Sequence, residues 1–476
     1  MKGNTVIIAR GLNLYKEGQM GWLPSRSTHC VIKHLLTGLL AARSLARIPS
    51  DESITPMSLL FLREDTFTTT VFRTYCALRV ESMAEQAPEI PGYQGPAFFS
   101  YGFRPFFLGA ALFAGVAIPI WILVLAEVGH STFLYPARDW HVHEMVFGFL
   151  PAVITGFLLT AIPNWTDRPP IRGHELISLS ILWLAGRVLI AVPWFTPLVS
   201  AIVDAGFLVT VAGLVWREIV VSKSWDRAPM GVLVSLLAGA NILFHVLTLS
   251  GVETDRPERM ALAMVMMLLT LIGGRLIPTF TGELLTNAGR AEQPASFSRY
   301  DAVSIALVGF AVAFWIAQPR SMATGWIFVA AGFVNLGRLA RWYGWTTWRE
   351  PLVLILHFGY GWFALSLLIL GGSILGIGLP QEDAVHAFTT GAVGAMTLAV
   401  MTRASLGHTG RPRHAGPLTV LIYMLVNLGA VLRVFGPMTG LPTNLVLGVA
   451  AGSWSGAYVL FAMIYGPFLL RPSLDE

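Results

Sequence analysis

The feature that most constrains this chain is a series of uninterrupted apolar runs, each about 20 residues long, which begins near residue 103. An α-helix rises about 1.5 Å per residue, so a run of that length crosses the ~30 Å hydrocarbon core of a bilayer. The chain is 54% hydrophobic and only 12% charged, whereas soluble domains carry roughly twice that charged fraction. These properties predict an integral membrane protein that crosses the bilayer many times.

We predict an all-α fold, a polytopic transmembrane helix bundle with about twelve spans. The bundle occupies a membrane domain over residues 96–472. The predicted spans lie near residues 103–128, 143–163, 175–193, 197–216, 230–250, 260–281, 301–318, 323–340, 351–374, 384–403, 416–435 and 443–469.

Residues 1–95 differ in character from the rest and are treated as an N-terminal extension. They contain scattered charged residues and no convincing span. The stretch from Met83, "MAEQAPEIPGYQGPAFFSYG", has the form of a natural beginning, a short polar, proline-containing lead into the first span. We therefore expect residues 1–82 to be either a disordered tail or an extension from a mis-assigned start, with Met83 as the alternative start.

The distribution of basic residues predicts how the spans are oriented. The net charge of +5 is attributed to loop residues that set topology rather than to a nucleic-acid-binding surface. Loops after even-numbered spans, with the C-terminal tail, contain thirteen Arg and Lys residues, and loops after odd-numbered spans contain five. By the positive-inside rule, the even-numbered loops and both termini are expected in the cytoplasm.

The two cysteines limit the chemistry of any cofactor in the membrane. Cys30 and Cys76 both precede residue 83, so the apolar body contains none. Disulfides, thiolate metal sites and covalent haem attachment are therefore excluded there. A cofactor in the membrane must be held by His, Met, Tyr or oxygen ligands.

Four histidines from three separate spans come to a similar depth near the predicted outer face. His141 and His143 begin the second span, His245 lies near the outer end of the fifth, and His386 begins the tenth. Converging neutral imidazoles suit a metal ion or haem iron. The alternative is that each histidine makes only an interhelical hydrogen bond, its usual role in a membrane. His357, near the inner end of the ninth span, is a candidate for a second site.

The spacing of these residues narrows the possibilities. Residues two apart on a helix diverge by about 200°, so His141 and His143 cannot chelate one ion from a regular helix. Either the helix starts between them or they serve different sites, and Glu144 is placed to orient an imidazole. In the tenth span, His386 and Gly394 lie on one predicted face, which favours either close helix packing or a flat macrocycle with His386 as its axial ligand.

Two arginines within or beside the spans are further candidates for cofactor binding. Arg187 and Arg275 each follow a glycine, and a buried guanidinium can bind carboxylates such as haem propionates. The alternative is structural pairing with Asp204 or Glu283, or capping of a helix broken at Pro278.

Several stretches resemble the NnrS family and follow its order over about residues 95–470. They are "SYGFRPFFLGAALFAG", "WHVHEMVFGF", "GFLLTAIPNWT", "LWLAGR", "RLIPTFT" and "HAFTTGAVGAMTLAVMTRASLGHTGRP". The resemblance implies a bacterial inner-membrane protein that contains haem and copper and is associated with nitric oxide stress and denitrification. The matching histidines are His141, His143, His245, His357, His386 and His408.

These observations leave three hypotheses, and whether the chain is an enzyme stays open. The first is a haem and copper protein that binds or detoxifies nitric oxide or protects iron pools from it, with membrane lipid as its surroundings. The second is a transporter or chaperone that supplies copper, haem or a metabolite to denitrification enzymes, with a broken sixth span and Arg275 forming the substrate site. The third, a reductase like the haem–copper oxidases, is disfavoured because the chain lacks an adjacent His-His pair.

Overall fold

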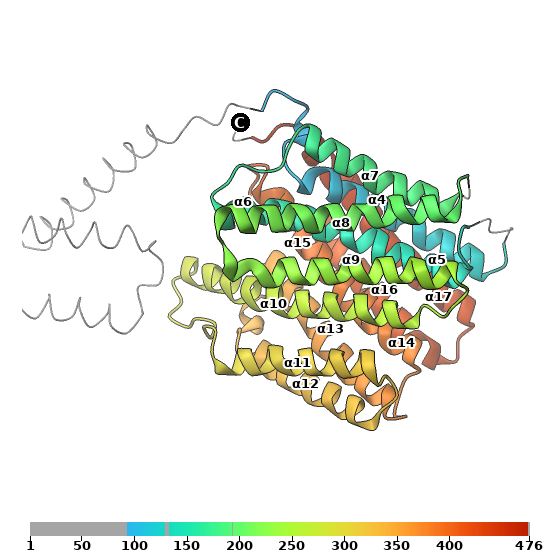
Figure 1. Ribbon diagram of the computed structural model, residues 1–476. Helices are drawn as coiled ribbons and strands as arrows, with labels where there is room; N and C mark the ends of the chain where they lie inside the picture. The colour runs from blue at the N-terminus through green and yellow to red at the C-terminus, as the bar shows by residue number, and fades with distance from the viewer. Residues whose placement is uncertain (1–92, 129–132, 193, 475–476) are drawn as a thin grey trace, which may run out of the picture. The chain divides into compact units, whose positions relative to one another are not determined.

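The computed structural model describes residues 93–128, 133–192 and 194–474 (Figure 1). Residues 1–92, and with them Met83, lie outside the described residues. Twelve helices of the described part are long and apolar enough to cross a membrane. That part of the chain contains no strand. The predicted all-α fold with about twelve spans is therefore confirmed.

Eight of the spans are each a single α-helix, and four are composite. The single helices are α4 (Phe103–Leu125), α7 (His174–Ala191), α8 (Pro197–Ser222), α10 (Asp255–Asn287), α11 (Arg299–Ala317), α12 (Met322–Ala340), α13 (Pro351–Ile374) and α17 (Thr443–Leu470). The composite spans are α5 (Ala137–His143) with η2 (Glu144–Phe149) and α6 (Leu150–Thr166), η3 (Trp225–Arg227) with α9 (Ala228–Leu249), α14 (Gln381–His386) with η5 (Ala387–Val393) and α15 (Gly394–Gly407), and α16 (Pro417–Phe435) with η6 (Gly436–Thr439). Short 3₁₀ turns η1 (Ala97–Phe99) and η4 (Gly344–Thr347) precede α4 and α13.

Helices that follow one another in sequence mostly pack against one another. The helices from α7 to α13 form such a series, and α16 packs on α17, which in turn packs on α4. Figure 1 shows α8, α9, α10 and α11 lying roughly side by side. The most buried spans are α5–α6, α14–α15 and α13, in which 78%, 72% and 67% of the most apolar 18-residue stretch is buried inside the bundle. These three innermost spans carry His141, His143, His386 and His357.

Two of the innermost spans change from α-helix to π-helix immediately after a candidate histidine. The π-helical segment η2 follows His143, and η5 follows His386. Such wide turns are rare and occur mostly at functional sites. In the second case Gly394 leaves room for the indole of Trp454, since a methyl group at Gly394 would lie 2.7 Å from its Nε1. Gly394 thus serves helix packing.

The sixth span is not broken. The helix α10 runs continuously from Asp255 to Asn287 with Pro278 inside it. The hydroxyls of Thr279 and Thr281 donate to the carbonyls of Arg275 and Ile277, four residues earlier, at 2.7 and 2.8 Å. Local bonding of this kind is one way in which membrane helices accommodate proline. The broken-helix substrate site expected around Arg275 is therefore not observed.

A buried arginine that the sequence analysis did not single out joins α10, α11, α12 and α13. Arg338 is 1% exposed, and its Nε donates to Asp301 Oδ1 at 2.9 Å. Its Nη1 donates to the Thr270 carbonyl at 3.0 Å and to the Tyr360 hydroxyl at 2.9 Å. The same hydroxyl donates to Asn335 at 2.7 Å. An ion pair buried with this many partners strongly destabilises a fold when only one member is removed.

We therefore predict that Arg338→Met lowers the free energy of unfolding by about 3 kcal/mol, because it leaves Asp301 with less compensating charge. Arg341 also pairs with Asp301, at 3.2 Å, but its side chain is 28% exposed. Arg341→Met should cost less than about 1 kcal/mol. Unfolding of both variants in detergent by denaturant or heat measures the difference, and equal losses would contradict the assignment.

Candidate functional site

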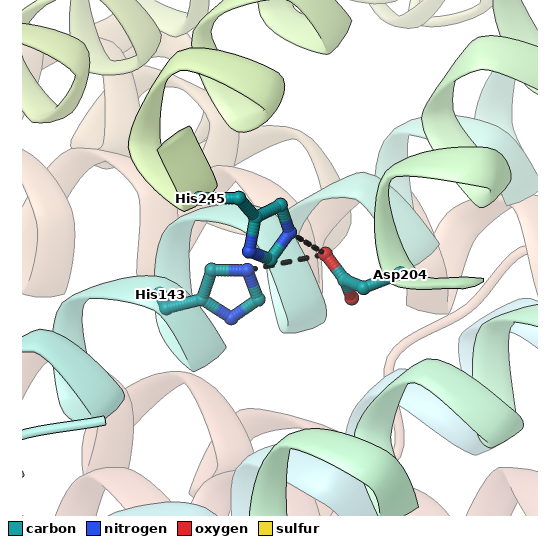
Figure 2. A group of neighbouring side chains, drawn as sticks. All are labelled: His143, Asp204 and His245. Atoms are coloured by element: carbon teal, nitrogen blue, oxygen red, sulfur yellow. Dashed lines mark hydrogen bonds and ion pairs between the residues drawn. The ribbon is translucent and has the colours of Figure 1, made fainter. Parts of the chain in front are cut away.

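Three buried side chains from distant parts of the chain meet at one point. Figure 2 shows His143, Asp204 and His245 pointing toward one another; they belong to α5, α8 and α9 and are 0%, 2% and 3% exposed. The Nε2 atoms of His143 and His245 lie 3.1 and 2.8 Å from Asp204 Oδ2. One ligand atom from each residue lies within 4.8 Å of the others, an arrangement that could hold a metal ion. We call these three residues the central cluster.

The central cluster is held by three further polar side chains. His143 Nδ1 lies 2.9 Å from Glu144 Oε1. Arg187 donates to Glu144 Oε1 at 2.7 Å and, through its other terminal nitrogen, to Asp204 Oδ1. Asn241 donates to Asp204 Oδ2 at 3.0 Å. Arg187 thus makes the pairing with Asp204 that the sequence left as an alternative, and Glu144 contacts an imidazole as expected.

Tyr135, from the loop before α5, fixes the orientation of His245. Its hydroxyl lies 2.5 Å from His245 Nδ1. Burial raises the pKa of the Tyr135 phenol; the charge of Glu144 adds to the rise and that of Arg187 opposes it. Because the Asp204 carboxylate can only accept, His245 donates its Nε2 hydrogen to Asp204, and the protonated phenol donates to Nδ1. Hydrogen bonds of this type set which imidazole nitrogen faces a ligand.

Two glycines explain how an arginine and two carboxylates fit between packed helices. A methyl group at Gly148, in η2, would overlap the guanidinium of Arg187, and one at Gly186, in α7, would lie 2.9 Å from Asp204 Oδ1. Trp183 also donates from its indole to the Gly148 carbonyl at 2.9 Å. The π-helical segment, the glycines and this bond together position α7 so that Arg187 reaches both carboxylates.

The charged groups in and around the central cluster have a net charge that one cation would neutralise. Glu144 and Asp204 contribute two negative charges and Arg187 one positive charge, so neutral imidazoles leave a net charge of minus one. Both ring nitrogens of His143 face carboxylate oxygens, although a neutral imidazole has one N–H. In the described part of the chain, Glu144 Oε2 and Asn241 Oδ1 are buried without a hydrogen-bond partner. A proton or a metal cation would balance the charge.

A second feature lies at the same end of the bundle, where α5, α10 and α14 begin. It is a cavity of about 1270 Å³ that is lined by both His141 and His386; we call it the end cavity. His386 Nδ1 donates to the Glu382 carbonyl at 2.6 Å, which leaves Nε2 with its lone pair. The ring of His141 stacks on Trp121 at 4.5 Å and 7°. His141 and His143 therefore face different sites, as their spacing allowed.

The lining of the end cavity also contains many charged groups. Arg138 donates to Glu258 at 3.0 Å, and Arg433 donates to Asp383 at 2.5 Å. The arginines of the lining are Arg138, Arg256, Arg259, Arg320 and Arg433. Such an arrangement suits a ligand with an apolar body and carboxylate groups.

The remaining predicted residues lie elsewhere. His357 Nε2 is 2.9 Å from the Thr281 hydroxyl, near the opposite end of α10. His408, just after α15, packs against Tyr101 and Phe103 with ring centroids 6.2 and 5.6 Å apart. Arg275 is exposed, and Glu283 instead pairs with Arg403 and Arg413. The structure brings none of His357, His408 and Arg275 to the central cluster or the end cavity, and the ligand roles of all the predicted residues stay predictions.

Some residues of the site were missed from the sequence. Tyr135 and Asn241 were not singled out, and Asp204 was considered only as a partner of Arg187. For Asp204 and Asn241 a signal exists, because polar side chains inside a span are costly and need a reason. For Tyr135 there is none, since a loop tyrosine beside a membrane helix is common.

The glycine argument can be tested by adding one methyl group. We predict that Gly148→Ala destabilises the protein by about 1–3 kcal/mol, because the methyl group displaces Arg187 from Glu144. Gly239→Ala is the matched control, since nothing lies within 4 Å of a methyl group there and alanine in a helix is about 0.5–1 kcal/mol more favourable than glycine. Thermal unfolding of both variants should show changes of opposite sign; a stable Gly148→Ala variant would refute the role of this glycine.

A family model described as NnrS protein matches residues 97–473, most of the chain. No curated protein matches the chain.

Proposed function

Because the chain belongs to the NnrS family, a family linked to the nitric oxide response, we propose that it is a copper- and haem-binding protein of that response. It binds or detoxifies nitric oxide, or protects iron pools from it. The twelve spans make it a multi-pass membrane protein. We place it in the bacterial inner membrane with both termini in the cytoplasm, which puts the central cluster near the periplasmic face.

The observation that carries this proposal is the central cluster. Imidazole nitrogens suit copper, as they also suit zinc, iron and nickel, and His143, Asp204 and His245 present two of them with a carboxylate oxygen. The uncompensated negative charge fits a singly charged cation such as Cu(I). With a cation at the two Nε2 atoms, His143 would donate its Nδ1 hydrogen to Glu144 and His245 would donate its Nδ1 hydrogen to the Tyr135 oxygen. Such bonds commonly orient imidazole ligands in metal sites.

The end cavity is the proposed haem site. Its volume of about 1270 Å³ exceeds the ~300–1,000 Å³ of ordinary small-molecule pockets. His386 would hold the haem iron through Nε2, because its Nδ1 is bonded to a backbone carbonyl. His141 is the second candidate ligand, and Arg138 and Arg433 are placed to bind propionates.

The chain's own residues would make these sites suitable for a small neutral ligand. When bound, haem iron and copper would supply a metal orbital that binds nitric oxide. The side chains of the central cluster are almost completely removed from bulk solvent. Arg187 bonds to Asp204 Oδ1 and leaves Oδ2 facing the two imidazoles. The uninterrupted α10 favours resident cofactors over transport through a broken span.

Histidine variants test the copper site. We predict that the purified protein contains copper and that His143→Ala and His245→Ala lose it, because each removes a ligand. Glu144→Gln should weaken copper binding about 10–100-fold, as loss of an orienting hydrogen bond does. Elemental analysis and copper titration measure these changes. His357→Ala is the control and should retain copper; labile copper with measurable uptake into vesicles would instead favour the transporter.

The haem site is tested by the visible spectrum. We predict that the wild-type protein has a Soret band and that His386→Ala shifts or abolishes it, since the axial nitrogen is removed. His141→Ala should change the same band, and His408→Ala should leave it unchanged. Spectra of the reduced proteins with and without nitric oxide provide the measurement. A wild-type protein without haem, or identical spectra in all variants, would refute this assignment.

A further inference from the structure

A groove on the outer surface of α8 and α9 reaches the central cluster from a different side. Its volume is about 330 Å³, and we call it the lateral groove. Leu198 and Ile202 on its border are each 62% exposed, so in a membrane this surface faces lipid. The lining residues are Leu198, Ala201, Ile202, Ala205, Gly206, Val209, Ile242, His245, Val246 and Leu249. His245 is the single polar residue among them.

Small residues of α8 form the hollow. Ala201, Ala205 and Gly206 lie where larger side chains would fill the space between the two helices. Nothing lies within 4 Å of a methyl group placed at Gly206. A larger side chain at this position would therefore enter the lateral groove without displacing its neighbours.

His245 connects the lateral groove with the interior. His245 lines the groove, while its Nε2 lies 2.8 Å from Asp204 and its ring centroid 4.9 Å from that of His143. One residue of the central cluster therefore also borders the lipid-facing groove, although it is itself only 3% exposed.

The chemistry of the lining indicates what it would admit. A charged or strongly polar molecule would lose its hydration in this groove without gaining a hydrogen bond, which is unfavourable. An uncharged diatomic gas such as nitric oxide loses little hydration and dissolves in hydrocarbon. The end cavity, with its arginines and carboxylates, has the opposite character and suits a charged ligand.

We propose that the lateral groove is an entry path by which a small uncharged gas dissolved in the bilayer reaches the central cluster beside His245. This inference rests on the proposed function, because it supplies nitric oxide to the proposed copper site. Gly206 is the residue that keeps the path open, and no residue of the end cavity takes part in it.

The path can be tested without any metal by using xenon, which binds in apolar cavities. Crystals of the purified full chain under xenon gas are expected to show xenon beside His245. Gly206→Leu should abolish that density. Gly213→Leu is the matched control, since Gly213 lies on the same helix, has nothing within 4 Å of a methyl group and does not line the groove. It should leave the xenon in place.

A second measurement concerns the rate of access. In copper-loaded protein reconstituted into phosphatidylcholine vesicles, Gly206→Leu should slow the association of nitric oxide several-fold, while Gly213→Leu should not change it. Copper content, measured on each sample, tests the proposed function separately. Xenon beside His245 in a protein that binds no copper would refute the proposed function but support the entry path. No xenon in the wild type, an ordered acyl chain in the groove, or an unchanged rate in Gly206→Leu would overturn the path.

Discussion

The interaction on which the candidate site depends is the pairing of Arg187 with two carboxylates inside the membrane. Burying an ionised carboxylate costs several kcal/mol unless it is paired and hydrogen-bonded, and Glu144 and Asp204 are both almost fully buried. The planar guanidinium contacts both at once, which a lysine could not do with the same geometry. Without it, the two buried carboxylates would lose their cationic partner, and Asp204, which contacts both His143 and His245, would lose the bond that holds it in place.

The π-helical segments separate the candidate histidines from the residues that pack deeper in the same spans. In the second span, His141 faces the end cavity and His143 the central cluster, and η2 follows immediately. In the tenth span, η5 follows His386 in the same way. A wide turn rotates all later side chains of a span relative to the earlier ones. The residues before the turn can therefore orient the histidine while those after it pack deeper in the bundle. The two most buried spans share this device.

The sequence predicted the number of spans and the depth of the histidines, because apolar runs measure position along the membrane normal. It did not predict which histidines meet, because hydropathy contains no information on how helices rotate about their axes. His143 joins His245 while His141 and His386 share a cavity, and that division depends on packing. For the same reason the sequence did not predict that Asp204 contacts both histidines, because that contact depends on how α8 packs against its neighbours. The π-helical segments were also not predicted, since an apolar run has the same composition and length in an α-helix and in a π-helix. Pro278 was wrongly taken to break the sixth span. The helix continues through it, and the hydroxyls of Thr279 and Thr281 bond to backbone carbonyls beside it.

Charge balance connects the central cluster with its two very different neighbours. With neutral imidazoles the group formed by Glu144, Arg187, Asp204, His143 and His245 has one net negative charge, and a singly charged cation makes it neutral. A neutral centre interacts only weakly with its surroundings, so it can border an apolar groove at His245 at little electrostatic cost. A doubly charged ion would leave a net positive charge beside lipid, where no counter-charge lines the groove. For the proposed copper ion, the arrangement therefore favours the reduced, singly charged state.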